Sequence, residues 1–182
     1  MWLDGNGKSY EPGDSVPADV TELTVQWTAP TYAVTLNTNG GTINSGNVTG
    51  YTYGVGATLP IADDMTYTGH TFKGWYDNES LTGSPVTAIG DTETGNKEYW
   101  AKWEINQYTI TYDLAGGTVE GNPDTYTIKT GAFTLKNPTK SGYTFTGWSG
   151  TGLDGENNMT VTIPTGSTGN RTYTAHWRYN GS

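Results

Sequence analysis

The chain repeats itself with a period of about 75 residues, and this repetition constrains its fold more than any other feature of the sequence. Residues Tyr32–Ile43, which contain a Gly-Gly-Thr sequence, return as Tyr108–Val119. Residues Gly69–Trp75 return as Gly142–Trp148. A repeat of this length predicts a series of similar small units joined in tandem.

The first residues of the chain match the back half of another copy. Leu23–Trp27 matches both Tyr99–Trp103 and Tyr173–Trp177, and Trp2 matches Trp75. We therefore expect four segments: the C-terminal half of a repeat at 1–27, whole repeats at 32–103 and 108–177, and a tail or the start of a further linker at 178–182.

The pattern within a repeat predicts strands and tight turns. Tyr32–Leu36 alternates large apolar side chains with small or polar ones, and this period of two is typical of a half-buried strand. Asn39–Gly41 follows, where a tight turn needs a positive φ. Gly74 and Gly147 interrupt a later strand and are expected to be bulges or close-packing positions. With 13 Tyr, 7 Trp and 26 Gly, the chain is expected to be mainly β.

Little helix is expected. No apolar stripe at helical spacing exceeds a single turn, and residues 62–66 and 138–141 can form at most one turn each. The connectors between the segments, 28–31 and 104–107, are both four residues long. Because four residues span at most about 13–14 Å, neighbouring repeats are expected to lie end to end.

A set of large aromatic residues is expected to form the structural core: Trp27, Phe72, Trp75, Trp103, Phe145, Trp148 and Trp177. Trp100 differs, because its counterparts are Thr24 and Thr174 and the shared fold does not require Trp there. Two interpretations of Trp100 stay open. It covers a loop peculiar to its own repeat, or it is an exposed contact for a partner or glycan.

The charge and composition exclude several classes of partner. The formal net charge of −9 at pH 7 argues against nucleic acid and against anionic membrane surfaces. No signal peptide opens the chain, and no apolar run approaches the roughly 18–20 residues of a membrane span, so membrane insertion is not expected. The chain contains no Cys, which excludes disulfides and thiolate metal sites but not secretion.

The motifs Tyr-x-Val/Ile-Thr, Gly-Gly-Thr, Gly-x-Thr-Phe-x-Gly-Trp and Ala-x-Trp follow one another in each whole repeat. In this order and period they resemble the Listeria–Bacteroides repeat family, the B-repeats of internalin-type proteins. The resemblance covers essentially the whole chain. It implies a small β-grasp-like unit with a mixed sheet, found in tandem in bacterial surface proteins, and it brings no catalytic residue or cofactor. The missing helical sequence predicts that the grasping helix is lost.

The residues that most often carry catalysis have structural interpretations here. His70 stands where the other repeat has Tyr143, which indicates a packing position. His176 stands where the other repeat has Lys102, which indicates a position facing solvent. The acidic pair Asp63–Asp64 falls in a connecting loop and is expected to be solvated rather than to act as a glycosidase pair.

No catalytic, cofactor-binding or metal-binding residue is expected. The Ser residues lie in turn-like stretches without a Gly-x-Ser-x-Gly elbow, although sequence order alone does not exclude a Ser-His-Asp arrangement. Asp4–Gly7 has the start of a calcium loop but no acidic ligand at the right place downstream, so a hairpin turn is expected.

Three classes of function remain. An extracellular spacer at the cell surface or in the cell wall explains the repetition and the short connectors. A binding module for a host protein or carbohydrate explains the surplus aromatics, whereas an enzyme needs a pocket unique to one repeat. Residues 1–27 lack the first strand and its Gly-Gly turn. They are expected to fray or to complete a sheet with a neighbouring molecule, which makes the chain a monomer or a weakly associating one.

Overall fold

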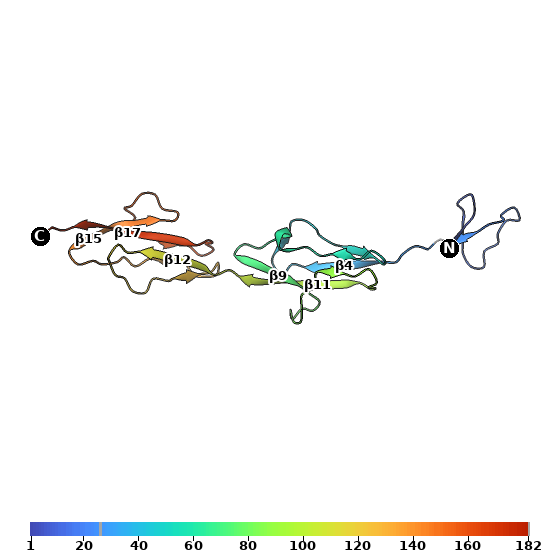
Figure 1. The fold of residues 1–182 in the computed structure, drawn as a ribbon, viewed down its shortest axis with the longest axis horizontal. Helices are drawn as coiled ribbons and strands as arrows, with labels where there is room; N and C mark the ends of the chain where they lie inside the picture. The colour runs from blue at the N-terminus through green and yellow to red at the C-terminus, as the bar shows by residue number, and fades with distance from the viewer. Residues whose placement is uncertain (26, 182) are drawn as a thin grey trace.

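The computed structural model describes residues 1–25 and 27–181, and these are mainly β. We call residues 1–27 the N-terminal segment, 32–103 the first unit and 108–177 the second unit. In Figure 1 they follow one another along the long axis of the molecule, with the N-terminal segment at the right. Within the described residues, the single helical element is the 3₁₀ turn η1 (Ala62–Asp64). The mainly β class is thereby confirmed, together with the scarcity of helix.

The first unit is organised around a mixed sheet with the strand order β6-β4-β11-β9. Its strands are β4 (Thr31–Asn37), β6 (Gly50–Thr52), β9 (His70–Tyr76) and β11 (Lys97–Ile105). β11 pairs in parallel with β4 and antiparallel with β9, so the first and last strands of the unit are neighbours. Two short antiparallel pairs complete the unit: β5 (Thr42–Ile43) with β8 (Met65–Thr66), and β7 (Ala57–Thr58) with β10 (Ala88–Ile89).

The second unit repeats this plan with the strand order β13-β12-β17-β15. Its strands are β12 (Tyr108–Asp113), β13 (Thr125–Tyr126), β15 (Tyr143–Gly150) and β17 (Arg171–Tyr179), with β14 (Phe133–Thr134) paired to β16 (Thr162–Ile163). β12 and β17 are the parallel pair. Because the same order recurs, the internal repeat seen in the sequence is also a repeat of structure.

The predicted turns and bulges are confirmed by the backbone. Asn39 and its counterpart Ala115 have φ values of 50° and 49°, each followed by a Gly with positive φ. Both sheets shift register next to the predicted bulge glycines, Gly74 and Gly147. At Gly147, φ is 138° and a Cβ would lie 2.5 Å from the backbone carbonyl carbon of Asn157, so only glycine fits.

Each unit has its own apolar core, and the expected aromatics divide into three groups. Trp75 and Trp148 are 1% and 0% exposed. Four aromatics pack against these cores while remaining partly exposed: Phe72, Trp103, Phe145 and Trp177. The expectation that Trp27 belongs to the core is wrong, because its side chain is 89% exposed.

The exposure of Trp27 has a direct structural cause. The Trp103 ring packs against Gly41, and the Trp177 ring against Gly117, in the turn that follows the first strand of each unit. The N-terminal segment contains no such strand or turn. Trp27 therefore matches Trp103 and Trp177 in sequence, but the N-terminal segment has no counterpart of the turn that covers those two rings.

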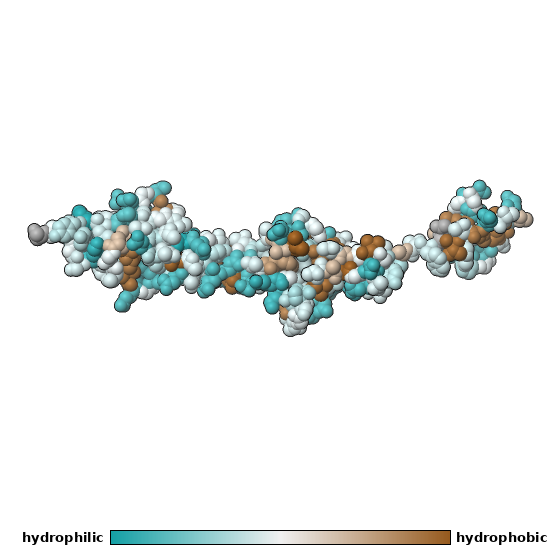
Figure 2. All heavy atoms as spheres, viewed as in Figure 1, coloured by the Kyte–Doolittle hydropathy of each residue, from teal (hydrophilic) through white to brown (hydrophobic). Residues whose placement is uncertain are grey.

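The N-terminal segment forms a small sheet of its own with the order β2-β1-β3. Its strands are β1 (Trp2–Leu3), β2 (Ser9–Tyr10) and β3 (Thr24–Val25). The Asp4 carboxylate accepts hydrogen bonds from the backbone N–H groups of Asn6 and Lys8, which closes the β1–β2 turn. The predicted hairpin is confirmed. Figure 2 shows apolar residues, in brown, gathered on the surface of this segment.

Candidate functional site

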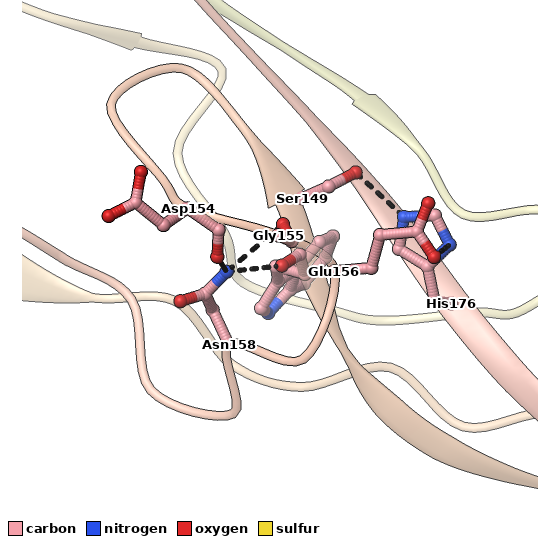
Figure 3. Close-up of polar contacts among 7 residues, drawn as sticks. Ser149, Asp154, Gly155, Glu156, Asn158 and His176 are labelled. Atoms are coloured by element: carbon pink, nitrogen blue, oxygen red, sulfur yellow. Dashed lines mark hydrogen bonds and ion pairs between the residues drawn. The ribbon is translucent and has the colours of Figure 1, made fainter.

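The second unit brings a serine, a histidine and a glutamate together on the surface of its sheet. Ser149 lies on β15 and His176 on the neighbouring β17, and the Ser149 hydroxyl shares a hydrogen bond of 2.7 Å with His176 Nε2. Glu156 approaches from the loop after β15, with its Oε2 at 3.8 Å from His176 Nδ1. Figure 3 shows the serine and glutamate side chains directed toward the imidazole.

Asn158 fixes the loop that carries Glu156. Its side-chain N–H groups donate to the carbonyl oxygens of Asp154 and Trp148, both at 2.9 Å (Figure 3). The Asn158 carbonyl in turn accepts a hydrogen bond of 2.8 Å from the Trp148 backbone N–H. Because Trp148 is in the core, the loop is anchored to the most buried point of the unit, and Glu156 is held near His176.

The arrangement shares one feature with a nucleophilic Ser-His-acid triad and differs from it in two others. The Ser149–His176 distance is in the range that a serine and its general base require. The Glu156 carboxylate, however, is beyond hydrogen-bond distance of Nδ1 and its side chain is 70% exposed, so it orients the imidazole weakly. Ser149 also lies within a paired strand, opposite Thr174, rather than on the sharp turn that exposes a nucleophile.

The first unit explains what these positions do. The counterparts of Ser149 and His176 are Tyr76 and Lys102, and the Lys102 ammonium lies 5.4 Å from the centroid of the Tyr76 ring. Both units therefore use this place for a contact between neighbouring strands, with a cation–π pair in one and a hydrogen bond in the other. We interpret Ser149–His176 as a sheet contact. Ser149 is the member that the sequence analysis missed.

A second cluster lies in the first unit, where His70 occupies the packing position expected for it. Its imidazole stacks on Tyr67 with ring centroids 3.8 Å apart. Tyr67 and Phe72 each meet the Trp103 ring edge-on, with centroids 5.3 Å away. These four aromatic side chains line an open cavity of 390 Å³. We call them the aromatic groove. In the second unit the counterpart surface is different, because Lys140 lies over Tyr143.

Trp100, the candidate contact, is half-buried on β11. It pairs with Tyr76 on β9, and the corresponding pair in the second unit is Thr174 with Ser149. Trp100 is therefore neither a core residue like Ala101 nor a freely projecting one. Trp100 lies opposite Tyr76, a larger side chain than the Ser149 that stands opposite Thr174 in the second unit.

The acidic candidates act in local structure. Asp64 is the last residue of η1, and Ile61 directly precedes this turn. The Asp64 carboxylate accepts a hydrogen bond of 2.6 Å from the Ser45 hydroxyl and one of 3.0 Å from the Ile61 backbone N–H. These hydrogen bonds, that from Ser45 above all, lower the pKa of Asp64 and keep its carboxyl ionised. It is thus a poor general acid. No group of three or more His, Asp or Glu side chains within residues 1–25 and 27–181 is placed to hold a metal ion.

Tyr112 has a strongly raised pKa, and the contacts around its side chain belong to the fold of the second unit. Its hydroxyl donates a hydrogen bond of 2.7 Å to the carbonyl oxygen of Pro123. Burial, and to a smaller extent the nearby Asp124, raises the pKa of Tyr112 to about 12. The side chain therefore remains neutral and packs against the core of the second unit.

Alkaline stability is expected to depend on Tyr112. A tyrosine titrates near pH 10 when unfolded, so the stabilisation from its neutral form is complete below that pH and is lost as pH rises through about 12. Thermal melts of the chain and of Tyr112→Phe across this range measure the effect. We expect a shallower loss of melting temperature in the variant, because phenylalanine does not ionise. Equal slopes for the two proteins would contradict the assignment.

Comparison with known proteins gives the family of the chain and several relatives. The sequence profile of the Listeria-Bacteroides repeat domain matches residues 32–102 and 108–176. A protein of Evansella cellulosilytica named as a Gly-rich membrane protein is 35% identical over 158 residues, which are 80% of this chain and 16% of that protein. A second protein of this organism, named as a membrane protein, is 31% identical over 74% of the chain and 19% of its own length.

Internalin H of Listeria monocytogenes is 30% identical over 103 residues, which are 57% of this chain and 18% of that protein. The chain thus spans less than one fifth of the length of each of these relatives. No solved structure matches it. Among the described residues, none forms a helix with the length and hydropathy needed to cross a membrane. With both whole repeats matched by the profile, the chain belongs to the Listeria–Bacteroides repeat family.

Proposed function

We propose that the chain is a non-catalytic spacer in an extracellular bacterial surface protein, where it projects other domains away from the cell. The family assignment and the similarity to an internalin and to proteins named as membrane proteins support a location at the cell surface. The structural interpretation of Ser149, His176 and Asp64 supports the absence of catalysis. We also propose that each unit is a reduced β-grasp, since its parallel first and last strands fit that plan and a loop stands in place of the helix.

The observation that carries the spacer function is the joint between the two units. β11 extends to Ile105 and β12 begins at Tyr108, so only Asn106 and Gln107 lie between strands. The Asn106 backbone N–H donates a hydrogen bond of 2.8 Å to the Gly69 carbonyl, and its side-chain oxygen accepts one from the Thr71 hydroxyl. The expected four-residue connector is therefore mostly strand and hydrogen-bonded loop, because β11 continues alongside β9.

The second unit also packs directly against the first. Gly69 is buried, and a Cβ at this position would lie 2.7 Å from Cβ of Ile128 in the second unit. Its counterpart Gly142 is exposed, and a Cβ there would meet nothing within 4 Å, although Asn180 donates its backbone N–H to the Gly142 carbonyl in the same way. The backbone hydrogen bond to this glycine carbonyl is thus present in each unit, whereas the burial of Gly69 comes from its contact with the unit that follows. Together they resist bending.

The connector after the N-terminal segment lacks this hydrogen bond. Pro30 stands where the joint has Asn106, and proline has neither a backbone N–H nor a side-chain amide. Figure 1 shows a single extended stretch of chain leading from this segment to the first unit. We expect this connector to bend more freely than the joint at Asn106.

Electron-spin distance measurements test the stiff joint. The chain has no Cys, so the exposed, equivalent threonines of β4 and β12 can be labelled through Thr35→Cys and Thr111→Cys. We expect a narrow distribution of label distances across the joint. A second pair, Ser9→Cys with Thr35→Cys, should give a broad one across the proline connector. Asn106→Pro should broaden the first distribution, because it removes the N–H that binds Gly69.

Ile128→Ala is the matched variant that leaves the connector intact and removes the side chain over Gly69, and it should broaden the distribution in part. Unchanged melting temperatures would show that both units still fold in these variants. A broad distribution in the parent chain, or one insensitive to Asn106→Pro, would contradict the spacer function. Small-angle scattering should in addition give an elongated particle rather than the radius of gyration of a compact chain of this length.

A binding function is the second candidate, and the aromatic groove favours it. Tyr67, His70 and Trp103 are half-exposed in the first unit, and aromatic faces of this kind stack on sugars and dominate protein contacts. A glycan array and a host-cell binding assay with the chain test the idea. Binding that is lost in Tyr67→Ala and kept in Lys140→Ala, the counterpart change in the second unit, would support the groove. Loss in Trp100→Thr would instead assign the contact to β11.

A further inference from the structure

Each whole unit carries a half-buried cation at the first residue of its last strand. This residue is Lys97 on β11 in the first unit and Arg171 on β17 in the second. Both cations lie beside a pair of buried tyrosines. The pairs are Tyr51 with Tyr99 in the first unit and Tyr126 with Tyr173 in the second. The two units therefore place a positive charge at the same point of the fold.

In the first unit a carboxylate from the turn before β11 neutralises this charge. Glu93 Oε1 lies 3.1 Å from the Lys97 ammonium. The second carboxylate oxygen of Glu93 accepts a hydrogen bond from the Gly90 backbone N–H at the start of the same turn. The half-buried cation of the first unit is thus paired with an acid of its own unit.

The second unit has the same turn without the carboxylate. Asn170 accepts a hydrogen bond of 3.0 Å from the Thr109 backbone N–H, and the corresponding asparagine of the first unit makes the same contact. Ser167 stands where the first unit has Glu93. Its hydroxyl donates a hydrogen bond of 2.6 Å to the Pro164 carbonyl. The turn therefore keeps its shape, while the acid that would face the cation is replaced.

Arg171 consequently keeps part of its guanidinium free of protein partners. Its Nε donates a hydrogen bond of 3.0 Å to the Tyr126 hydroxyl, and Nη1 donates one of 3.3 Å to the Tyr173 hydroxyl. In the described parts of the chain, 1–25 and 27–181, it forms no ion pair. A guanidinium has five N–H donors in a planar fork, and this fork binds a carboxylate through two parallel hydrogen bonds.

We propose that Arg171 and the turn at 164–170 form a binding site for an acidic sugar, a uronic acid, held by its carboxylate. The ligand carboxylate takes the position in the second unit that the Glu93 carboxylate fills in the first. It accepts the remaining N–H groups of the guanidinium, and the sugar hydroxyls lie against the turn. The site uses neither the joint at Asn106 nor the aromatic groove, so it is independent of the spacer function.

The surroundings of Arg171 favour a sugar over an acidic peptide. Residues 164–170 read Pro-Thr-Gly-Ser-Thr-Gly-Asn and contain no large apolar side chain. Hydroxyl and amide groups form hydrogen bonds with sugar hydroxyls, whereas a protein contact is built around an apolar or aromatic centre. The charge also fits an anionic ligand. Residues 108–177 hold five acidic and four basic side chains, a net charge of −1, whereas residues 32–103 hold seven and three, a net charge of −4.

Titration of the chain with a galacturonic acid trisaccharide tests the proposal, with the NMR signal of the Arg171 Nε–H group as the readout. We expect a saturable shift with a Kd of about 1 mM, the affinity of a small contact centred on one charged pair. The matched control ligand is the same trisaccharide with its carboxyl groups methyl-esterified. It carries no charge and should give no shift.

Ser167→Glu is the decisive variant, because it gives the second unit the carboxylate that the first unit has. The new side chain should pair with Arg171 and weaken binding of the trisaccharide by about tenfold or more. The melting temperature should not fall, since the change adds an ion pair and removes no core group. Glu93→Ser is the reciprocal variant in the first unit. It leaves Lys97 without its acid and should create a second site, seen as a shift of the Lys97 ammonium signal.

Three results would overturn the proposal: no shift with the galacturonic acid trisaccharide, an equal shift with its methyl ester, or unchanged affinity in Ser167→Glu. Tighter binding of triglutamate than of the trisaccharide would overturn the assignment to a sugar and indicate an acidic protein partner. None of these outcomes changes the label distances that test the spacer function, so the two proposals fail separately.

Discussion

Replacing Trp148 with alanine is expected to unfold the second unit and to leave the first unit folded. The side chain is 0% exposed, and its indole N–H donates a hydrogen bond of 3.0 Å to the Asn137 side chain. Emptying a core site of this size costs about 3–5 kcal/mol in free energy of unfolding. A small domain has only about 5–15 kcal/mol in total. The loss is confined to one unit because the two apolar cores share no residue.

Trp75→Ala is the matched control, since Trp75 is 1% exposed and its indole N–H donates to the Pro60 carbonyl in the first unit. Calorimetry of the two variants should show opposite losses, with one thermal transition displaced and the other retained. This outcome would establish that residues 32–103 and 108–177 are separate folding units. A single transition that shifts equally in both variants would show that the joint at Asn106 couples the units into one.

The features that the sequence predicted correctly are those that short-range chemistry determines. The alternation in Tyr32–Leu36 fixes which side chains of β4 face the core, whatever strand pairs with it. A positive φ is required at Gly40, and the bulge at Gly74 needs a residue without a Cβ. Comparison of the repeats supplied the rest of the pattern, because a position that keeps its residue type in each copy serves the shared fold.

The features that the sequence did not predict depend on contacts between distant residues. Trp27 lies in the motif that supplies a packed tryptophan in both whole repeats. In those repeats the tryptophan is covered by the Gly-Gly turn, which lies far from it in the sequence. Ser149 meets His176 only because the bulge at Gly147 sets the register of β15 against β17. Ile128 lies over Gly69 only once the joint has positioned the two units. Such contacts follow from register and docking, which residue types alone do not encode.

Replacing Trp103 with alanine is expected to be nearly as damaging as the loss of Trp148. Trp103 packs against Phe72 and Tyr67 and donates its indole N–H to the Thr38 carbonyl, so the change removes both packing and a hydrogen bond. We expect a loss of about 3–5 kcal/mol in free energy of unfolding. Trp100→Thr, on the same strand, should cost less, under about 1 kcal/mol, because Trp100 is only half-buried and Thr174 occupies the same position in the second unit. Thermal melts of the two variants give the comparison, and equal losses would make Trp100 a core residue.

A double-mutant cycle with Gly41 identifies the contact that makes Trp103 important. Gly41→Ala introduces a methyl group where the Trp103 ring lies, without the strain of a positive φ, and should cost about 1–3 kcal/mol through overpacking. In the Trp103→Ala background the ring is absent, so the same substitution should cost close to nothing. The coupling energy is then most of the Gly41→Ala cost, within the range of about 0.5–3 kcal/mol found for residues in contact. Additive losses would show that Gly41 is needed for the turn itself and that the indole does not require it.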